Sequence, residues 1–415
     1  MIEVTWLLRH HPKTPANSAA TIGPAGQLFR LGTNGCSSEV AASMKRVVLT
    51  GLALIVLGAV GVFLFAWSGL YSVAASKGHW PIVHWVLEFG MRKSVETHAF
   101  GIETPPLDDR ALFERGIGHF QGGCAPCHGA PGLPQNPIAQ QMLPSPPDLS
   151  KVAPTWKSHQ LFWIVKHGLK YTGMPAWPTP TRDDEVWALV AFLVRLPDIT
   201  PDEYRRLALV DGVSTTVTAP LATVAGFIGG DLTACARCHG LQGEGSEAGG
   251  VPRIAGQKSE YLLMTLADYA LGTRPSGIMG PVATYLTDAE KRKLSAHYGE
   301  LGRGSASKSE GRREIPSVEP KMLQLGGAIA AVGIPSLSIP ACEACHGPNG
   351  GARDKNPRYP ALAGQHFAYL EQQLKLWRSA ARGGTFDQIM STVVRNITDE
   401  QIRAVSLYYA NLSRE

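Results

Sequence analysis

The motif Cys124-Ala-Pro-Cys127-His128 returns twice further along the chain, as Cys235-Ala-Arg-Cys238-His239 and Cys342-Glu-Ala-Cys345-His346. The first cysteines of successive motifs are 111 and then 107 residues apart. A glycine follows each histidine, and six of the seven cysteines belong to the three motifs. Each interval is the size of one small domain, so the spacing predicts three tandem repeats.

The pattern Cys-x-x-Cys-His is typical of covalent c-type haem attachment. Two thiols at this spacing form thioether bonds to the two vinyl groups of one haem, and the next histidine becomes the proximal ligand of the iron. We therefore predict three covalently bound haem c groups. Their attachment and proximal residues are Cys124, Cys127, His128, Cys235, Cys238, His239, Cys342, Cys345 and His346.

Three other uses of paired cysteines remain open as alternatives. A zinc ribbon needs Cys-x-x-Cys units in pairs, and three units leave one unpaired. A thioredoxin-type redox site needs a βαβ context, which the sequence does not show. Structural disulfides between such close cysteines would be strained and would not require a histidine each time.

A methionine lies at a regular position behind each motif. Met174, Met279 and Met390 stand seven or eight residues before Thr181, Thr287 and Thr398, each of which precedes an apolar-periodic stretch. A thioether sulfur is a suitable sixth ligand for haem iron. The shared offset predicts that these three methionines are the distal iron ligands, whereas one methionine alone would more simply fill a core.

The apolar-periodic stretches predict a closing helix in each repeat. We expect the pairs Thr181 and Asp184, Thr287 and Glu290, and Thr398 and Gln401 to cap these helices, the first only approximately. Pro197 should end the first helix. The predicted buried stripes are Val186, Leu189, Val190 and Leu193 in the first repeat, and Ile402, Val405, Tyr409 and Leu412 in the third.

The second and third repeats align beyond the motif, with Ala-Gly-Gln257 matching Ala-Gly-Gln365. Met264 aligns with Gln372, which indicates that Met264 packs and that Met279 is the ligand. Pro252 aligns with Pro360, and Pro147 is the candidate equivalent in the first repeat. The carbonyl of each proline could accept the Nδ1 proton of the proximal histidine and orient its ring, unless these are ordinary turn prolines.

An apolar run without charge over residues 47–67 is long enough to cross the hydrocarbon core of a bilayer, which is about 30 Å thick. Lys45 and Arg46 precede it, so the positive-inside rule places everything after the run outside the cytoplasm. We expect a retained anchor over residues 44–68. The alternative is a signal peptide cleaved near Val73-Ala74-Ala75.

We make separate predictions for the segments before and after this anchor. Residues 1–43 show no clear periodicity, so we expect a leader or a start that lies upstream of the true one, near Met44. Residues 69–106 form a juxtamembrane amphipathic segment, in which Trp80 and Trp85 suit a membrane interface. A docking helix for a membrane partner is the alternative for this segment.

The repeats should occupy residues 107–200, 220–303 and 322–415, with linkers over residues 200–219 and 303–321. The formal net charge is +5, and the basic residues are scattered rather than clustered, so nucleic-acid binding has little support. The propionates of three haems would offset most of this charge. We predict a mainly α fold of three tandem domains behind one transmembrane helix.

The three repeats resemble class I c-type cytochromes over roughly residues 107–415. The first repeat, with its motif and Thr172-Gly173-Met174-Pro175, looks like the single-haem domains of membrane-bound respiratory cytochromes. The second and third are similar to the two halves of cytochrome c4. Membrane-anchored three-haem members of this family often accept electrons from periplasmic alcohol, aldehyde or molybdenum hydroxylase-type dehydrogenases.

The resemblance implies an electron carrier rather than an enzyme, tethered to the inner membrane with its haem domains in the periplasm. A periplasmic dehydrogenase or a respiratory complex would donate electrons, and a terminal oxidase or small cytochrome would accept them. The carrier could be the electron-transfer subunit of such a complex. A haem enzyme such as a peroxidase is the alternative, with His159, His167, His297 or His366 near the iron, and an assembly subunit is a third possibility. A thiolate-ligated haem is disfavoured because the seventh cysteine, Cys36, precedes the apolar run.

Overall fold

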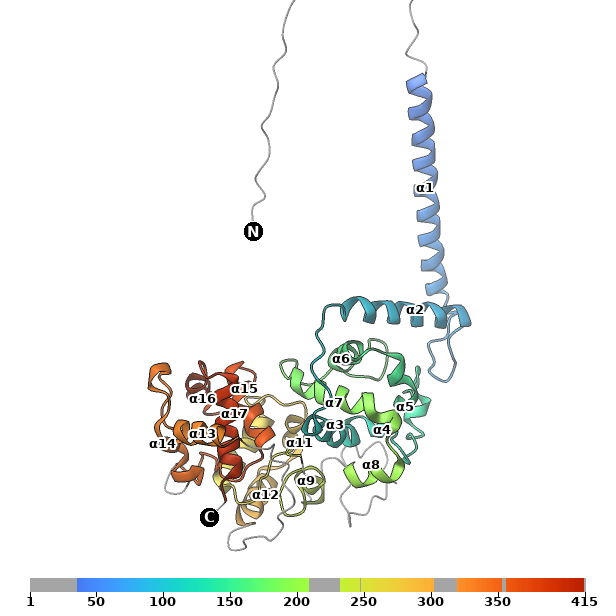
Figure 1. Ribbon diagram of the computed structural model, residues 1–415. Coiled ribbons are helices and arrows are strands. Elements are labelled where there is room, and N and C mark those ends of the chain that lie inside the picture. Colours follow the sequence, from blue (N-terminus) through green and yellow to red (C-terminus); the bar gives the residue numbers. More distant parts are fainter. Residues whose placement is uncertain (1–35, 209–231, 247, 302–318, 353–355, 414–415) are drawn as a thin grey trace, which may run out of the picture. The chain divides into compact units, whose positions relative to one another are not determined.

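The computed structural model describes residues 36–208, 232–246, 248–301, 319–352 and 356–413. Over these residues the chain forms helices joined by loops, and none of them lies in a β-strand (Figure 1). The chain divides into a compact unit of Met1–Val73 and a second compact unit of Ala74–Glu415. The predicted mainly α fold with one long apolar N-terminal helix is confirmed.

The first unit contains helix α1 (Cys36–Trp67). Its segment Val40–Trp67 has a mean hydropathy of 2.7, and none of its most apolar stretch is buried within the protein. At about 1.5 Å per residue this segment exceeds the thickness of a bilayer core. It is therefore a candidate membrane anchor or signal sequence. The helix begins at Cys36, earlier than expected, because residues of the predicted leader continue the helical hydrogen bonding.

Helix α2 (Pro81–His98) opens the second unit, with a proline at its first turn. Its C-terminal end is packed: Val95 is fully buried, and the His98 ring lies 5.6 Å from that of Trp163. Its N-terminal half exposes Trp85 and Phe89, whose rings stack 5.6 Å apart. The predicted amphipathic segment is thus a helix whose apolar face is left uncovered by the described residues.

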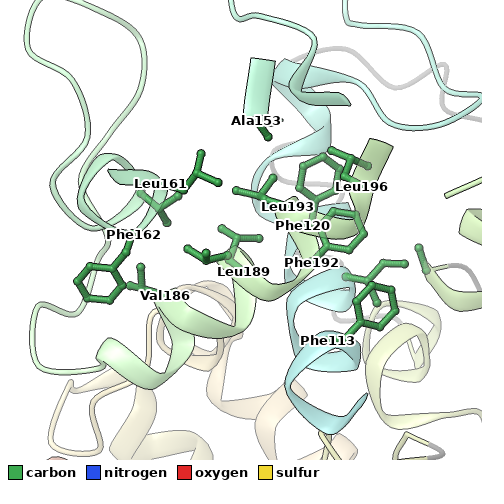
Figure 2. Packing of buried hydrophobic residues seen from close by; sticks show 14 of the residues in the cluster. Phe113, Phe120, Ala153, Leu161, Phe162, Val186, Leu189, Phe192, Leu193 and Leu196 are labelled. Atoms are coloured by element: carbon green, nitrogen blue, oxygen red, sulfur yellow. The ribbon is translucent and has the colours of Figure 1, made fainter. Parts of the chain in front are cut away.

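The first repeat is built from α3 (Arg110–Gly123), α4 (Ala125–His128), α5 (Leu149–Val152), α6 (Ser158–His167), α7 (Asp183–Arg195) and α8 (Pro201–Ala208). Figure 2 shows its core, where Phe113 and Phe120 of α3 meet Phe192 of α7. The two helices cross at Gly116, where a Cβ atom would lie 2.1 Å from the carbonyl oxygen of Ala188. The four residues of the predicted stripe, Val186, Leu189, Val190 and Leu193, are all buried.

The first repeat extends beyond the predicted boundary at residue 200. Tyr204 of α8 is fully buried beside Phe120 and Phe192, and its hydroxyl donates to Gln121 Oε1 over 2.5 Å. Residues 201–208 therefore belong to the core rather than to a linker, because Tyr204 fills a gap between α3 and α7. The rest of that predicted linker, and most of the linker over residues 303–321, lies outside the described residues.

The second repeat contains α9 (Leu232–His239), α10 (Ser259–Ala270), α11 (Met279–Tyr285) and α12 (Asp288–Glu300). The third contains α13 (Pro320–Val332), α14 (Glu343–His346), α15 (Phe367–Arg378), α16 (Asp387–Val393) and α17 (Asp399–Asn411). Short 3-10 turns lie at Ala139–Gln141, Ala153–Thr155, Leu196–Asp198, Pro335–Leu337 and Pro348–Gly350. In the third repeat the stripe residues Ile402, Val405 and Tyr409 are buried, and Leu412 packs against the same core.

Two of the three predicted caps are confirmed. Thr287 with Glu290 caps α12, and Thr398 with Gln401 caps α17, each as a reciprocal capping box. The first prediction is wrong: α7 begins at Asp183 and Arg182 is its N-cap residue. The carboxylate of Asp184 instead accepts from the Arg182 guanidinium, at 2.8 and 2.9 Å.

Four reciprocal hydrogen bonds join the second and third repeats. Gln257 donates its Nε2 to Ala361 O and accepts from Ala361 N, at 2.8 and 3.0 Å. Gln365 does the same with the oxygen and nitrogen of Arg253, again at 2.8 and 3.0 Å. Arg253 and Ala361 are equivalent positions, so the two repeats meet through a pseudo-twofold contact of their Ala-Gly-Gln segments.

Candidate haem centres

Each cysteine motif lies on a short helical segment that a glycine ends. Helices α4, α9 and α14 finish at His128, His239 and His346. The glycines that follow, Gly129, Gly240 and Gly347, have φ angles of 70°, 78° and 78°. A residue with a side chain is strained at such angles, which explains the glycine after each histidine.

The three motif histidines share one hydrogen-bond arrangement. The Nδ1 atom of His128 lies 2.8 Å from the carbonyl oxygen of Pro147, and His239 and His346 make the same contact with Pro252 and Pro360 at 3.0 Å. The predicted proline acceptors are therefore confirmed in all three repeats. Because the carbonyl can only accept, Nδ1 carries the proton and Nε2 keeps a lone pair for a metal.

Burial lowers the pKa of His128, His239 and His346, and the bond to the proline carbonyl offsets part of that shift. The imidazoles are therefore neutral at pH 7, the form that binds iron. Burial also raises the pKa of Cys124 to about 12 and that of Cys342 to about 11.

The properties of these thiols bear on the alternative roles of the cysteines as a redox site, a disulfide or a zinc site. A reactive redox thiol has a lowered pKa, which is the opposite of what burial produces here. The six motif cysteines are free rather than joined in disulfides. Across the described ranges no three His, Cys, Asp or Glu side chains gather as a metal site, so a zinc ribbon gains no support. Covalent attachment of haem c is the use that fits the motifs.

The third repeat contains a mostly apolar cavity that brings its predicted ligands together. Cys342, Cys345, His346 and Met390 all line it, and α10 of the second repeat closes it with residues that include Met264. The buried donors in its wall that have no hydrogen-bond partner include Trp377 Nε1, Ser406 Oγ and Tyr409 Oη.

The polar atoms of this cavity suit the polar edge of a haem. Arg274 and Arg382 also line it, and both are buried. The two cations and the unpaired donors suit the two propionate carboxylates of one haem, and the apolar walls suit its ring. The residues therefore fit haem c.

In the first repeat, Met174 and Cys124 both pack against the core. Its backbone N–H donates to Thr172 Oγ1 over 3.0 Å, which shapes the loop that carries it. Sequence reasoning did not single out Met142, yet its sulfur lies 2.9 Å from where a Cβ atom on Gly173 would be. No periodicity marked Met142, because it stands in an irregular loop.

In the second repeat, Met279 is the first residue of α11, and its N–H donates to Ser276 Oγ over 3.0 Å. Met264 lines the cavity of the third repeat. That Met264 packs and that Met279 is the ligand stays a prediction.

The alternative histidine ligands take other roles. His366 is bound through Nε2 to the carbonyl oxygen of Glu244 at 2.7 Å. His167 lies against the Trp163 ring at 5.1 Å, and His297 against Tyr298, also at 5.1 Å. Neither these three nor His159 lines the cavity of the third repeat.

Sequence reasoning missed the buried arginines between the second and third repeats. Arg274 donates to Tyr369 Oη over 3.2 Å and to Gln373 Oε1 over 3.3 Å, and Arg382 donates to the same Gln373 oxygen over 2.5 Å. Arg274 and Arg382 are 108 residues apart, the same offset as between Tyr261 and Tyr369. Extending the alignment of the two repeats would have found them.

Two family models match the chain. The model described as cytochrome c oxidase, cbb3-type, subunit III matches residues 111–193, and the model described as cytochrome c matches residues 231–297. These two stretches coincide with the first two repeats. Cytochrome c domains imply covalently bound haem c.

Several cytochromes are about one-third identical to this chain over the aligned residues. A thiosulfate dehydrogenase electron acceptor from Stutzerimonas stutzeri is 34% identical over 190 residues, which cover 44% of this chain and 80% of that protein. Cytochrome c4 from Thiocapsa roseopersicina is 34% identical, covering 43% of this chain and 88% of the relative. The solved cytochrome c4 from Acidithiobacillus ferrooxidans is 30% identical, with a TM-score of 0.37, and covers 43% of this chain and 98% of that structure.

Proposed function

The chain belongs to the class I c-type cytochromes, and on this premise we propose that it is a membrane-tethered carrier of single electrons with three covalently bound haem c groups. Its haem domains lie in the periplasm and α1 is the anchor in the inner membrane. The observation that carries the proposal is the threefold recurrence of a motif histidine whose Nδ1 is held by a proline carbonyl.

The residues that would hold the three iron atoms are His128, His239 and His346, through Nε2, and Met174, Met279 and Met390, through sulfur. Each haem, when bound, would supply an iron that can take up and release one electron. The proline carbonyls orient the imidazoles and increase their basicity, and the thioether ligands favour the ferrous state relative to a second imidazole. If a histidine and a methionine both bind each iron, no position would be left for a substrate, which favours electron transfer over catalysis.

The proposed donor is a periplasmic dehydrogenase, and the acceptor is a terminal oxidase or a small cytochrome. The names of the relatives support a dehydrogenase, since two of them are electron acceptors of thiosulfate dehydrogenase. A respiratory complex that oxidises quinol is the second candidate for the donor.

Haem content tests the cofactor assignment. The double variant Cys342→Ala/Cys345→Ala should hold two haems per chain instead of three, as measured by intact mass and by the pyridine haemochrome absorbance per protein. Cys36→Ala is the matched control and should keep three, because Cys36 stands outside the motifs. A wild-type chain that holds two haems would contradict the proposed count.

Spectroscopy tests the role. Reduced-minus-oxidised spectra should show low-spin iron throughout at neutral pH. A substantial high-spin fraction would contradict a pure carrier and favour a haem enzyme. Reduction by candidate dehydrogenases, each with its own substrate, then identifies the donor.

A further inference from the structure

Helix α7 of the first repeat places a buried carboxylate against the loop that precedes Met279. Glu185 is only 4% exposed. It accepts hydrogen bonds from Ser276 Oγ over 2.6 Å, from Gly277 N over 2.7 Å and from Trp177 Nε1 over 3.2 Å. One carboxylate of the first repeat therefore binds two consecutive residues of the second.

Ser276 connects Glu185 to Met279 through its hydroxyl group. Its Oγ accepts from Ile278 N over 3.2 Å and from Met279 N over 3.0 Å. A hydroxyl has one proton and two lone pairs, so donation to Glu185 leaves both lone pairs for these two backbone donors. The orientation of the hydroxyl, and with it the start of α11, thus depends on Glu185.

Arg182 completes the contact from the same end of α7. Its Nη1 donates to Pro275 O over 2.6 Å, and its Nη2 lies 3.1 Å from Glu185 Oε1. Arg182 is 8% exposed, and within the interface it pairs with both Asp184 and Glu185. The residues from Pro275 to Gly277 are therefore held by a charged pair of the first repeat.

The loops that carry the two proposed methionine ligands also interlock sterically. A Cβ atom on Gly277 would lie 2.4 Å from Trp177 Nε1, and Trp177 follows Met174 by three residues. Ile278 packs against the core of the first repeat. On the motif side, a Cβ atom on Gly118 of α3 would lie 3.6 Å from Cys238 Sγ. The first repeat thus touches the second haem centre at both its methionine loop and its attachment motif.

We propose that Glu185 is a positioning residue that locks the Met279 loop, so that docking of the first repeat keeps the methionine on the iron of the second centre. The inference rests on the proposed function, in which Met279 is an iron ligand. It adds that the first and second centres are coupled: the sixth ligand of one is held by the closing helix of the other.

Displacement of the methionine ligand by imidazole, in the full-length ferric holoprotein, tests whether Glu185 holds the Met279 loop in place. Glu185→Ala removes the acceptor of three buried donors and should increase the affinity for imidazole at one of three haems by about tenfold to about a hundredfold, the range expected when a buried hydrogen bond to a charged group is lost. Ser276→Ala removes only the hydroxyl and should act at the same haem. Asp183→Asn is the matched control, since Asp183 lies on the same helix end, is exposed and pairs with Lys166.

Proton NMR of the ferrous protein identifies which haem responds. A methyl group bound to haem iron through sulfur gives an isolated upfield signal, and Met279→His should delete one of three such signals. Glu185→Ala and Ser276→Ala should broaden or weaken that signal and leave the other two, which also report that the rest of the chain is folded. If Glu185→Ala loses haem altogether, the milder variant Ser276→Ala decides whether the positioning role is correct, by its imidazole affinity and its methionine methyl signal.

The experiments distinguish a wrong positioning role for Glu185 from a wrong ligand assignment for Met279. If Met279→His deletes a signal but neither Glu185→Ala nor Ser276→Ala alters imidazole binding, Met279 is a ligand and the lock is wrong. If Met279→His deletes no signal, the ligand assignment itself is wrong, and the positioning role of Glu185 is then wrong as well. An equal response of all three haems would also overturn the lock.

Discussion

At the scale of single residues, each of the three motif histidines is oriented by one backbone acceptor. The acceptors are 19, 13 and 14 residues beyond His128, His239 and His346. This separation is short enough that the aligned prolines could be matched to the histidines before any contact was known. Each of these prolines lies outside the helices, so its carbonyl oxygen is not engaged in helical hydrogen bonding.

Two methionines line the cavity of the third repeat, and a pair of variants separates their roles. Met390→Leu should leave the third haem without its sixth ligand, because a leucine side chain has no lone pair to donate. A high-spin signal from about one haem in three should appear in the ferric spectrum. Met264→Leu conserves volume in the same cavity and should leave the iron low-spin. High-spin iron in Met264→Leu with none in Met390→Leu would reverse the assignment.

At the scale of elements, helix crossings in the first and third repeats depend on a single glycine. Gly116 lets α3 meet α7, and Gly326 lets α13 meet α17, where a Cβ atom would lie 2.2 Å from the carbonyl oxygen of Ala404. A backbone oxygen cannot move away as the end of a side chain can. The close approach therefore requires glycine for its lack of a Cβ atom, within ordinary helical geometry.

Gly326→Ala should destabilise the third repeat by about 3 kcal/mol, the upper part of the range for overpacking a close contact. Gly327→Ala is the matched control, because its Cβ would meet only the Tyr408 ring at 3.2 Å. Both changes raise the helix propensity equally, so their difference isolates the crossing. Guanidinium unfolding followed by haem absorbance would measure it, and equal stability of the two variants would contradict this account.

At the scale of the whole molecule, the second and third repeats associate through the reciprocal bonds of Gln257 and Gln365, and the first repeat attaches to the second through Glu185 and Arg182. Residues Ala74–Glu415 consequently form one compact unit. Helix α1 belongs to the other unit and shares none of this packing, since the most apolar part of Val40–Trp67 is unburied.

Because α1 belongs to a separate unit, we expect the rest of the chain to fold and keep its haem without it. A chain in which a cleavable secretion signal replaces residues 1–73 should be recovered from the soluble periplasm with its haem intact, because the compact unit begins at Ala74. The full chain should remain in carbonate-washed membranes. Recovery of the full-length gene product in the soluble fraction, shortened near residue 73, would show instead that α1 is a cleaved signal sequence.

The sequence by itself determined the features that depend on neighbours along the chain. The three Cys-x-x-Cys-His motifs, the glycines after them, two capping boxes, the apolar α1 and the proline acceptors each involve residues within about one or two helical turns or one loop of each other. Local hydrogen bonding and hydrophobic periodicity act over this range.

Only the tertiary structure decided the features that depend on partners far along the chain. The Tyr204 hydroxyl binds Gln121, which lies 83 positions away, and Gln365 and Glu185 bind residues 112 and 92 positions away. Arg182 replaced Thr181 as the N-cap residue because Pro275, which lies 93 positions away, and Asp184 engage its side chain. No local pattern encodes such partners: their hydrogen bonds form only once separate repeats have docked and excluded water.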